Sequence, residues 1–191
     1  MTDLQIGCLV GSLAQGSLNR RLAEALAARA PEGVKITEIT IGELPLFNRD
    51  MEVDYPQSAV RFKADVAATD ALLFVTPEHN RSIPAALKNA IDFASHPRGT
   101  NVLAHKPAAI LGASPGAVGT AAAQAHLRSI LPVLDVVLLG QPEMYLQVGI
   151  DSFDETGAPQ ELLGEHLDRF LDTFVTFARR HRAEPAQARV A

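Results

Sequence analysis

Short apolar runs alternate with longer stretches of helical periodicity along this chain. The apolar runs fall at residues 5–10, 35–39, 71–76, 107–112 and 135–139. Segments that are apolar on both faces are typical of strands buried in a parallel sheet, and the stretches between them are long enough for helices. The alternation therefore predicts an α/β fold in which right-handed crossovers place helices on both faces of one parallel sheet.

Five helices are predicted from the spacing of apolar residues. The first covers about residues 18–30 and the fourth about residues 120–134, and Pro84 is expected in the first turn of the third. The expected inward faces are Leu18, Leu22, Ala25 and Leu26; Val60, Ala64 and Ala67; Ile83, Leu87, Ile91 and Ala94; Leu127, Ile130, Leu131 and Leu134; and Leu163, Leu167, Phe170, Leu171, Phe174 and Ala178. Five strands and five helices in this order match a flavodoxin-like doubly wound, five-stranded parallel sheet with strand order 2-1-3-4-5.

Length and composition indicate one ordinary globular domain. We expect it to span residues 1–181, followed by a polar, Pro- and Ala-rich tail at 182–191 that is disordered. The net charge is −5 without a long basic run, so neither nucleic acid nor a membrane surface is expected as a partner. The single cysteine, Cys8, cannot form an internal disulfide, and no signal peptide is recognisable, so a cytoplasmic location is expected.

The first strand-to-helix loop, residues 11–19, has the composition of a phosphate site. Gly11 and Gly16 permit close backbone approach, and hydroxyls and helix N-terminal amides can donate to an anion. A Walker A loop requires a lysine where this chain has Ser17, and the dinucleotide-binding glycine pattern is absent. The loop therefore suits one phosphate bound by neutral donors, as in FMN, although such a turn could also serve only to cap the helix.

Two further loops follow the third and fourth strands, where ligands bind in sheets of this kind. Residues 76–84 place two prolines around a group of polar side chains, which suits either a rigid ligand-binding loop or a solvated turn. Residues 112–120 contain the Gly-x-Ser-x-Gly spacing of a hydrolase nucleophile elbow. Pro115 follows that serine and has no N–H for an oxyanion hole, which argues against an acyl hydrolase.

Taken together, the loops resemble the NAD(P)H-dependent FMN reductase family, which includes quinone, azo-dye and chromate reductases. The resemblance covers about residues 5–145 and rests on four motifs in the right order. These are Gly11-Ser12-Leu13 with Gly16-Ser17-x-Asn19, then Pro77-Glu78-His79-Asn80, then Ser82-Ile83-Pro84-x-x-Leu87-Lys88-Asn89-Ala90-Ile91-Asp92, and finally Gly112-Ala113-Ser114-Pro115-Gly116-x-x-Gly119-Thr120.

The resemblance implies a binding role for each loop. Around the FMN phosphate it places Gly11, Ser12, Gln15, Ser17 and Asn19 with the amides of Gly16, Ser17 and Leu18; along the isoalloxazine ring, Pro77, Glu78, His79 and Asn80; and at the pyrimidine edge, Ser114, Pro115 and Gly116. It also implies that NADPH or NADH passes hydride to flavin N5 and leaves, after which an acceptor takes the electrons. No side chain is expected to act as acid, base or nucleophile, and no metal site is expected.

Several positions differ from the family or have more than one interpretation. Many relatives have tyrosine where this chain has His79, and larger residues where it has Ala122 and Ala125. Arg81 could contact the phosphates of NAD(P)H or could be a solvated loop charge. Lys88, Asn89 and Asp92 are read as helix-surface or subunit-contact residues.

The expected function is that of an FMN-dependent oxidoreductase that uses NAD(P)H to reduce small acceptors such as quinones, azo compounds, free flavin or chromate. The alternatives are a flavodoxin-type electron carrier and a flavin-free regulatory domain. The resemblance further implies a homodimer or homotetramer.

Overall fold

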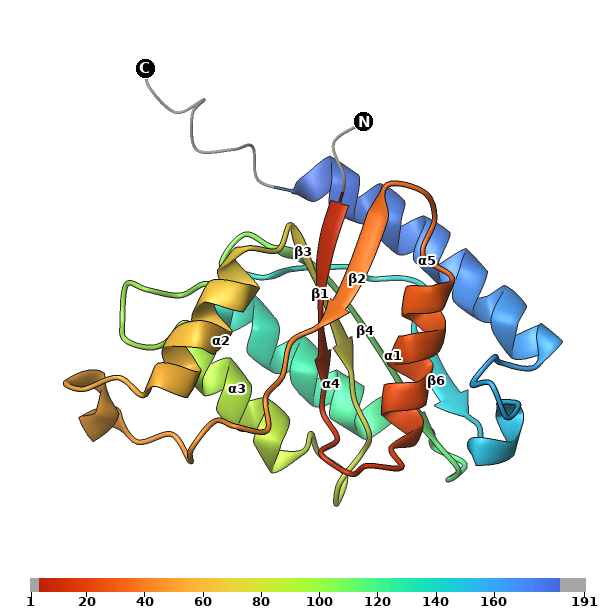
Figure 1. Ribbon diagram of the computed structural model, residues 1–191, viewed down its shortest axis with the longest axis horizontal. Coiled ribbons are helices and arrows are strands. Elements are labelled where there is room, and N and C mark those ends of the chain that lie inside the picture. Colours follow the sequence, from red (N-terminus) through yellow and green to blue (C-terminus); the bar gives the residue numbers. More distant parts are fainter. Residues whose placement is uncertain (1–3, 183–191) are drawn as a thin grey trace.

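In the computed structural model, which describes residues 4–182, a parallel sheet forms the centre of the molecule (Figure 1). Its strands are β1 (Leu4–Val10), β2 (Val34–Glu38), β3 (Ala71–Val75), β4 (Pro107–Ser114) and β5 (Val137–Leu138). They lie in the order β2-β1-β3-β4-β5, and every pairing is parallel. The predicted α/β flavodoxin-like topology is confirmed.

The fifth position of the sheet differs from the prediction, because two short strands occupy it. β5 pairs with the start of β4, and β6 (Met144–Gln147) pairs with its end from Leu111 to Ser114. Gly140 and Pro142 lie between them, and proline has no N–H to donate to a ladder. The predicted fifth strand therefore stopped at residue 139, and the sequence analysis missed β6.

Helices cover both faces of this sheet (Figure 1). The first face packs against α1 (Leu18–Ala28) and α5 (Glu161–His181), and the second against α2 (Gln57–Ala67), α3 (Ala85–Ser95) and α4 (Ala121–Ile130). Three short 3-10 helices lie between the other elements: η1 (Arg49–Glu52), η2 (Leu131–Leu134) and η3 (Ile150–Ser152). Within residues 4–182, no helix combines the length and apolarity that crossing a bilayer requires.

The predicted inward faces are correct for α1 and α5 but wrong for α2. That helix buries Ala59, Phe62 and Val66, whereas Val60 is 45% exposed. The expected face was therefore rotated around the helix, because the aromatic Phe62 dominates the packing. Ile83 is buried but precedes α3, whose N-cap is Pro84.

The fourth helix also ends earlier than expected. Regular α-helix stops at Ile130, and η2 continues it as a 3-10 turn that begins with Leu131 and Pro132. Proline cannot donate the amide that an α-helix would need at that position, so the hydrogen-bond pattern tightens. Leu127 and Leu131 are fully buried as predicted.

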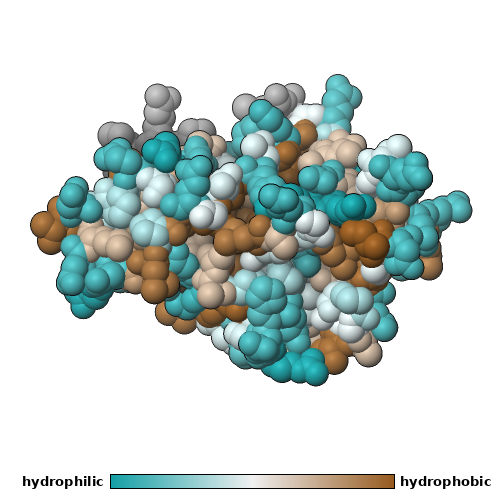
Figure 2. All heavy atoms as spheres, turned by 60° about the horizontal axis from the view of Figure 1, so that its bottom comes forward, coloured by the Kyte–Doolittle hydropathy of each residue, from teal (hydrophilic) through white to brown (hydrophobic). Residues whose placement is uncertain are grey.

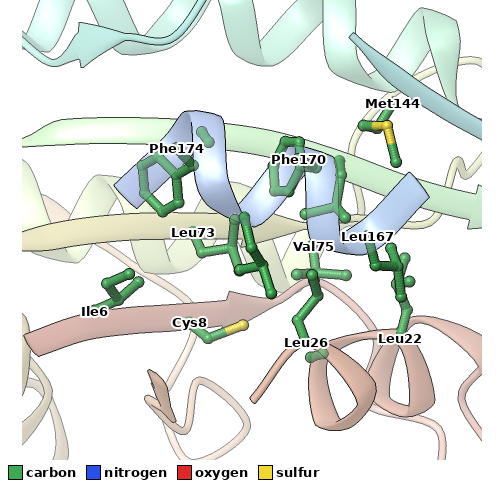
Figure 3. Close-up of a cluster of buried hydrophobic side chains, with 14 of the residues drawn as sticks. Ile6, Cys8, Leu22, Leu26, Leu73, Val75, Met144, Leu167, Phe170 and Phe174 are labelled. Atoms are coloured by element: carbon green, nitrogen blue, oxygen red, sulfur yellow. The ribbon is translucent and has the colours of Figure 1, made fainter. Parts of the chain in front are cut away.

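Figure 3 shows the core between the sheet and the α1/α5 layer, where Leu22 and Leu26 of α1 face Phe170 and Phe174 of α5 across strand residues. Cys8 lies within this cluster and is 1% exposed. Burial raises the pKa of the Cys8 thiol, so the thiol stays protonated and the expected inert, structural role fits.

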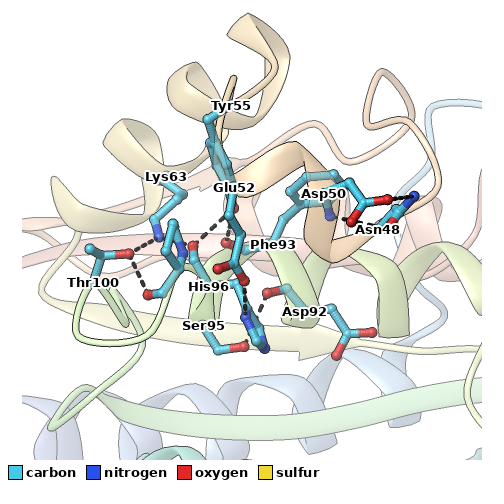
Figure 4. Close-up of polar contacts among 11 residues, drawn as sticks. Asn48, Asp50, Glu52, Tyr55, Lys63, Asp92, Phe93, Ser95, His96 and Thr100 are labelled. Atoms are coloured by element: carbon cyan, nitrogen blue, oxygen red, sulfur yellow. Dashed lines mark hydrogen bonds and ion pairs between the residues drawn. The ribbon is translucent and has the colours of Figure 1, made fainter.

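The long segment between β2 and α2, residues 41–55, is fixed by side chains near α3. Asn89 accepts from the Phe47 amide at 2.7 Å and donates to the Pro45 carbonyl at 2.8 Å, so this half-buried residue of α3 holds the segment in addition to any surface role. In Figure 4, the Tyr55 hydroxyl donates to the carbonyls of Phe93 and His96 at 2.8 and 2.9 Å. Desolvation is the main cause that raises the pKa of Tyr55 to about 12.

Predictions about the last residues remain untested. The expected disordered tail at 182–191 lies, apart from its first residue, outside the described residues.

Candidate functional site

Three loops meet at the carboxyl edge of β1, β3 and β4, which lies at the bottom of Figure 1. Backbone bonds fix where each loop leaves the sheet: Gly11 donates to Val75 at 2.9 Å, and Thr76 donates to Leu111 at 3.0 Å. Figure 2 turns this edge forward and shows hydrophilic and hydrophobic residues interspersed across it. All of the residues predicted for the site therefore belong to one edge of the molecule.

The first loop ends in an N-terminus of α1 that suits an anion. Ser17 is the N-cap, and its Oγ accepts from the Arg20 amide at 3.3 Å. The first turn of α1 contains no acidic residue, so the positive end of the helix dipole has no neutralising charge of its own. An added Cβ at Gly16 would meet no atom within 4 Å, so the space over this turn is open.

Asn19 has a different position from the one expected. It is 3% exposed, its Nδ2 donates to the Ala113 carbonyl at 2.9 Å, and its Oδ1 accepts from the Ala113 amide at 2.9 Å. Ala113 lies beyond the point where β3 ends, so the Asn19 amide continues the ladder in place of a strand. Asn19 thus joins the first loop to the base of the third, and a direct phosphate contact is no longer assigned to it.

Arg20 supports the first loop and was missed in the sequence. Its guanidinium donates to the carbonyls of Ala14 at 3.1 Å and Ser12 at 3.4 Å, and it pairs with Glu38 at 3.1 Å. By binding two carbonyl oxygens of the loop, the guanidinium fixes the loop backbone ahead of α1. The only sequence signal was an arginine in the first turn, which is not distinctive.

The second loop forms a tight hairpin at its tip. His79 and Ser82 exchange two backbone hydrogen bonds of 2.9 Å, and Asn80 and Arg81 between them have φ of 51° and 64°. Two successive left-handed residues are the signature of a type I′ turn, in which glycine normally takes the second place. Arg81 therefore holds a backbone conformation that costs free energy and that neighbouring contacts must stabilise.

Glu78 lies beside this hairpin, but its carboxylate faces α4. Oε2 accepts from the amides of Ala122 and Ala123 at 2.9 and 3.2 Å, and Oε1 accepts from Arg81 at 3.0 Å. The side chain is only 8% exposed. Its carboxylate is therefore engaged within the protein, and what Glu78 can offer a ring is its backbone.

The third loop requires glycine at its base. A Cβ at Gly112 would lie 2.1 Å from the Thr76 carbonyl oxygen and 2.4 Å from Thr120 Oγ1. The absence of a side chain thus lets the second loop and the start of α4 approach β4. Above it, Ser114 Oγ accepts from the Gly116 amide at 3.1 Å, which folds the loop back over Pro115.

A hollow of about 420 Å³ lies near Arg29, and one of about 500 Å³ lies beside the hairpin. The second is lined by His79, Asn80, Ser82, Ile83, Ala85, Lys88 and Ile130. Its lining combines polar and aliphatic side chains, which suits a small, partly polar organic molecule. Among residues 4–182 no group of three or more His, Cys, Asp or Glu is placed to hold a metal ion.

The fold and these loops define a class: a flavodoxin-like α/β protein with a helix N-terminus, free of acidic residues in its first turn, at the topological switch point of its sheet. Residues 4–150 match the model of the NADPH-dependent FMN reductases. The chain belongs to this family and is therefore an oxidoreductase.

Curated relatives and a solved structure agree with this membership. The chain is 45% identical over 180 residues to a 2-hydroxy-1,4-benzoquinone reductase of Burkholderia sp., covering 94% of this chain and 98% of the relative. It is 42% identical over 156 residues to an NAD(P)H-dependent FMN reductase of Pseudomonas aeruginosa, covering 81% and 84%. The structure of the flavoenzyme NAD(P)H:(acceptor) oxidoreductase FerB from Paracoccus denitrificans superposes with a TM-score of 0.90 at 38% identity, covering 94% of this chain and all of that one.

Proposed function

We propose that this protein binds FMN at the carboxyl edge of its sheet and uses NADPH or NADH to reduce small quinone-type acceptors. The single observation that carries the proposal is the N-terminus of α1, which has open space at Gly16 and no acidic residue in its first turn. Membership in the FMN reductase family supports the same reading.

The residues of the first loop fit a flavin phosphate. In the proposal, the amides of Gly16, Ser17 and Leu18 donate to the phosphate together with the side chains of Ser12 and Gln15. The positive end of the α1 dipole favours the dianion. Gly11 and Asn19 shape the loop from behind, because one lies against β3 and the other is bonded to β4.

The second and third loops would enclose the flavin ring. Backbone groups of Pro77 to Asn80 would line one side, and Ser114, Pro115 and Gly116 would face the pyrimidine edge. When bound, FMN supplies hydride acceptance from the nicotinamide and electron delivery to an acceptor. The chain's own part is to hold the ring, and Arg81, whose side chain is 70% exposed, can reach the phosphates of NAD(P)H.

Quinones are the acceptor class that the relatives' names favour. A Burkholderia relative reduces 2-hydroxy-1,4-benzoquinone, and two Pseudomonas putida relatives are quinone reductases. The hollow beside the hairpin is large enough for one such ring, and His79 in its lining can donate to a quinone oxygen. Azo compounds, free flavin and chromate are further acceptors to test.

Three further properties belong to this proposal. Residues 1–181 form one folding unit, the protein works as a homodimer or homotetramer, and it acts in the cytoplasm. Size-exclusion chromatography with light scattering tests the assembly.

The decisive experiment is a visible absorption spectrum of the purified protein after FMN addition and desalting, then after anaerobic NADPH. Retained flavin bands that bleach with NADPH or NADH support the proposal, and steady oxidation with benzoquinone present completes it. Retained bands that do not bleach indicate an electron carrier instead. If no flavin is retained, the assignment of all three loops is wrong.

A variant localises the phosphate. Ser17→Ala removes the side-chain cap of α1, and we expect FMN affinity to fall roughly tenfold, about 1.4 kcal/mol. The matched control is Ser58→Ala in the first turn of α2, which leaves FMN affinity unchanged. Equal FMN affinity for both variants would contradict the assignment of the phosphate to the α1 N-terminus.

A further inference from the structure

The N-terminus of α4 has no side-chain cap from its own segment. Its N-cap residue, Thr120, makes no side-chain bond to the first-turn amides, and its hydroxyl instead accepts from Gln124 Nε2 at 2.8 Å. The first turn contains no acidic residue. Because the first amides of a helix lack partners within the helix, another part of the chain must satisfy them.

Glu78 supplies that cap from the second loop, 44 residues earlier in the chain. One carboxylate oxygen accepts from two successive amides of α4, at Ala122 and Ala123, and the side chain is nearly buried. A carboxylate at a helix N-terminus has both the hydrogen-bonding geometry of a cap and a favourable interaction with the helix dipole. The other oxygen holds Arg81, the second left-handed residue of the hairpin.

A second contact attaches the far side of the same hairpin to the same helix. Ser82 Oγ lies 2.9 Å from His126 Nδ1, one helical turn after Ala122. Glu78 and Ser82 flank the tip formed by Asn80 and Arg81, so the hairpin is attached to α4 on both sides. Two attachments of this kind can stabilise successive left-handed residues that the local sequence disfavours.

We infer that Glu78 is a positioning residue of the flavin site. Its carboxylate fixes the hairpin of residues 79–82 to the N-terminus of α4 and so sets the spacing between the second and third loops. The third loop runs directly into α4, and therefore the hairpin and that loop move as one body. This inference rests on the proposed function only in assuming that a flavin ring binds between the second and third loops. The contact of Glu78 with the α4 amides is present without any bound flavin.

The test compares Glu78→Gln with Glu78→Ala, and with Glu43→Ala as matched control. Glu43 is 72% exposed and pairs with Arg61 at 3.3 Å on the surface. Glutamine keeps an oxygen for the two amides, whereas alanine leaves them open. We expect Glu78→Ala to weaken FMN binding about tenfold, the effect of losing a helix cap, while Glu78→Gln stays within about threefold of the parent.

Chemical rescue separates positioning from general loss of structure. Sodium formate supplies a carboxylate that can occupy the vacated amides, so it should restore FMN affinity to Glu78→Ala and leave the parent unchanged. Sodium chloride at equal ionic strength should restore nothing. Rescue by both salts, or by neither, would overturn the inference, as would equal FMN affinity for Glu78→Ala and the parent.

Amide hydrogen exchange on the protein without added flavin keeps the inference testable on its own. In Glu78→Ala, the amides of Ala122 and Ala123 should lose protection while that of Leu127 keeps it. Glu78→Gln should retain protection at all three, and if the alanine variant does not fold, loss of protection at Ala122 and Ala123 in Glu78→Gln overturns the inference. Unchanged protection in Glu78→Ala overturns the positioning role, whereas failure of the parent to retain FMN overturns only the proposed function.

Discussion

The first loop and the hairpin of the second lie at the same edge of the sheet but are held in different ways. The first is fixed to the sheet, through Asn19 on the backbone of β4 and Arg20 on the loop carbonyls. The hairpin is fixed to a helix, through Glu78 and Ser82 on α4. The position of the first loop is thus set by the sheet, whereas the position of the hairpin depends on where α4 lies.

Gly112→Ala should have the largest effect, because this glycine lies where both regions meet β4. The new Cβ would collide with the backbone of Thr76, which cannot move aside like a flexible side chain. We expect a loss of about 3 kcal/mol or more in the free energy of unfolding, measured by urea denaturation. Gly16→Ala, with no atom near its Cβ, is the control and should stay within about 0.5 kcal/mol of the parent.

Asn19→Ala should affect the first region alone. It leaves the buried N–H and C=O of Ala113 without partners, which costs about 1–3 kcal/mol of unfolding free energy. Asn19→Asp keeps an acceptor for the Ala113 amide but places a buried carboxylate against the Ala113 carbonyl oxygen, so at neutral pH it should lose at least as much stability as the alanine variant. Protection of the Ala122 amide should be unaffected in both, and a coupled loss there would show that the two regions are not independently held.

Much of this architecture could be predicted from the sequence, because short-range patterns determine it. Strand order followed from the alternation of apolar runs, and the inward face of α5 followed from its period. The contacts that complete the site join distant positions: Asn19 and Ala113 are 94 residues apart, and Glu78 and Ala122 are 44 apart. Nothing in the local sequence distinguishes an asparagine that bonds a remote strand from one that faces a ligand. The expected roles of Asn19 and Glu78 therefore came from the family resemblance, and the structure engages both side chains within the protein.

Arg20→Met should weaken FMN binding at the first loop while changing the free energy of unfolding only slightly. The ion pair of Arg20 with Glu38 is partly exposed and contributes under about 1 kcal/mol to folding. The loop carbonyls lose their donor, so FMN affinity should fall about tenfold, or 1.4 kcal/mol, by fluorescence titration. Arg21→Met, the neighbouring arginine, is the control, and equal losses for both would mean that general positive charge accounts for the effect.

Arg81→Gly should have the smallest effect on stability, and of opposite sign. Glycine relieves the left-handed conformation at φ 64° and completes an Asn-Gly type I′ turn, while the ion pair of the exposed Arg81 side chain with the nearly buried Glu78 carboxylate is lost. The net gain should be about 0.5 kcal/mol by thermal unfolding. KM for NADPH should rise severalfold in the same variant if Arg81 contacts the dinucleotide phosphates. An unchanged KM would leave Arg81 as a solvated charge.

The bond between Asn19 and Ala113 also bears on the order in which the protein forms. The first loop can assume its final geometry only after β4 has joined the sheet, since Ala113 provides the two backbone groups that hold Asn19. Contacts between residues so far apart form late in folding, because a long stretch of chain must first be closed. On a ribosome, the first loop would therefore lack its anchor until more than half of the chain had emerged.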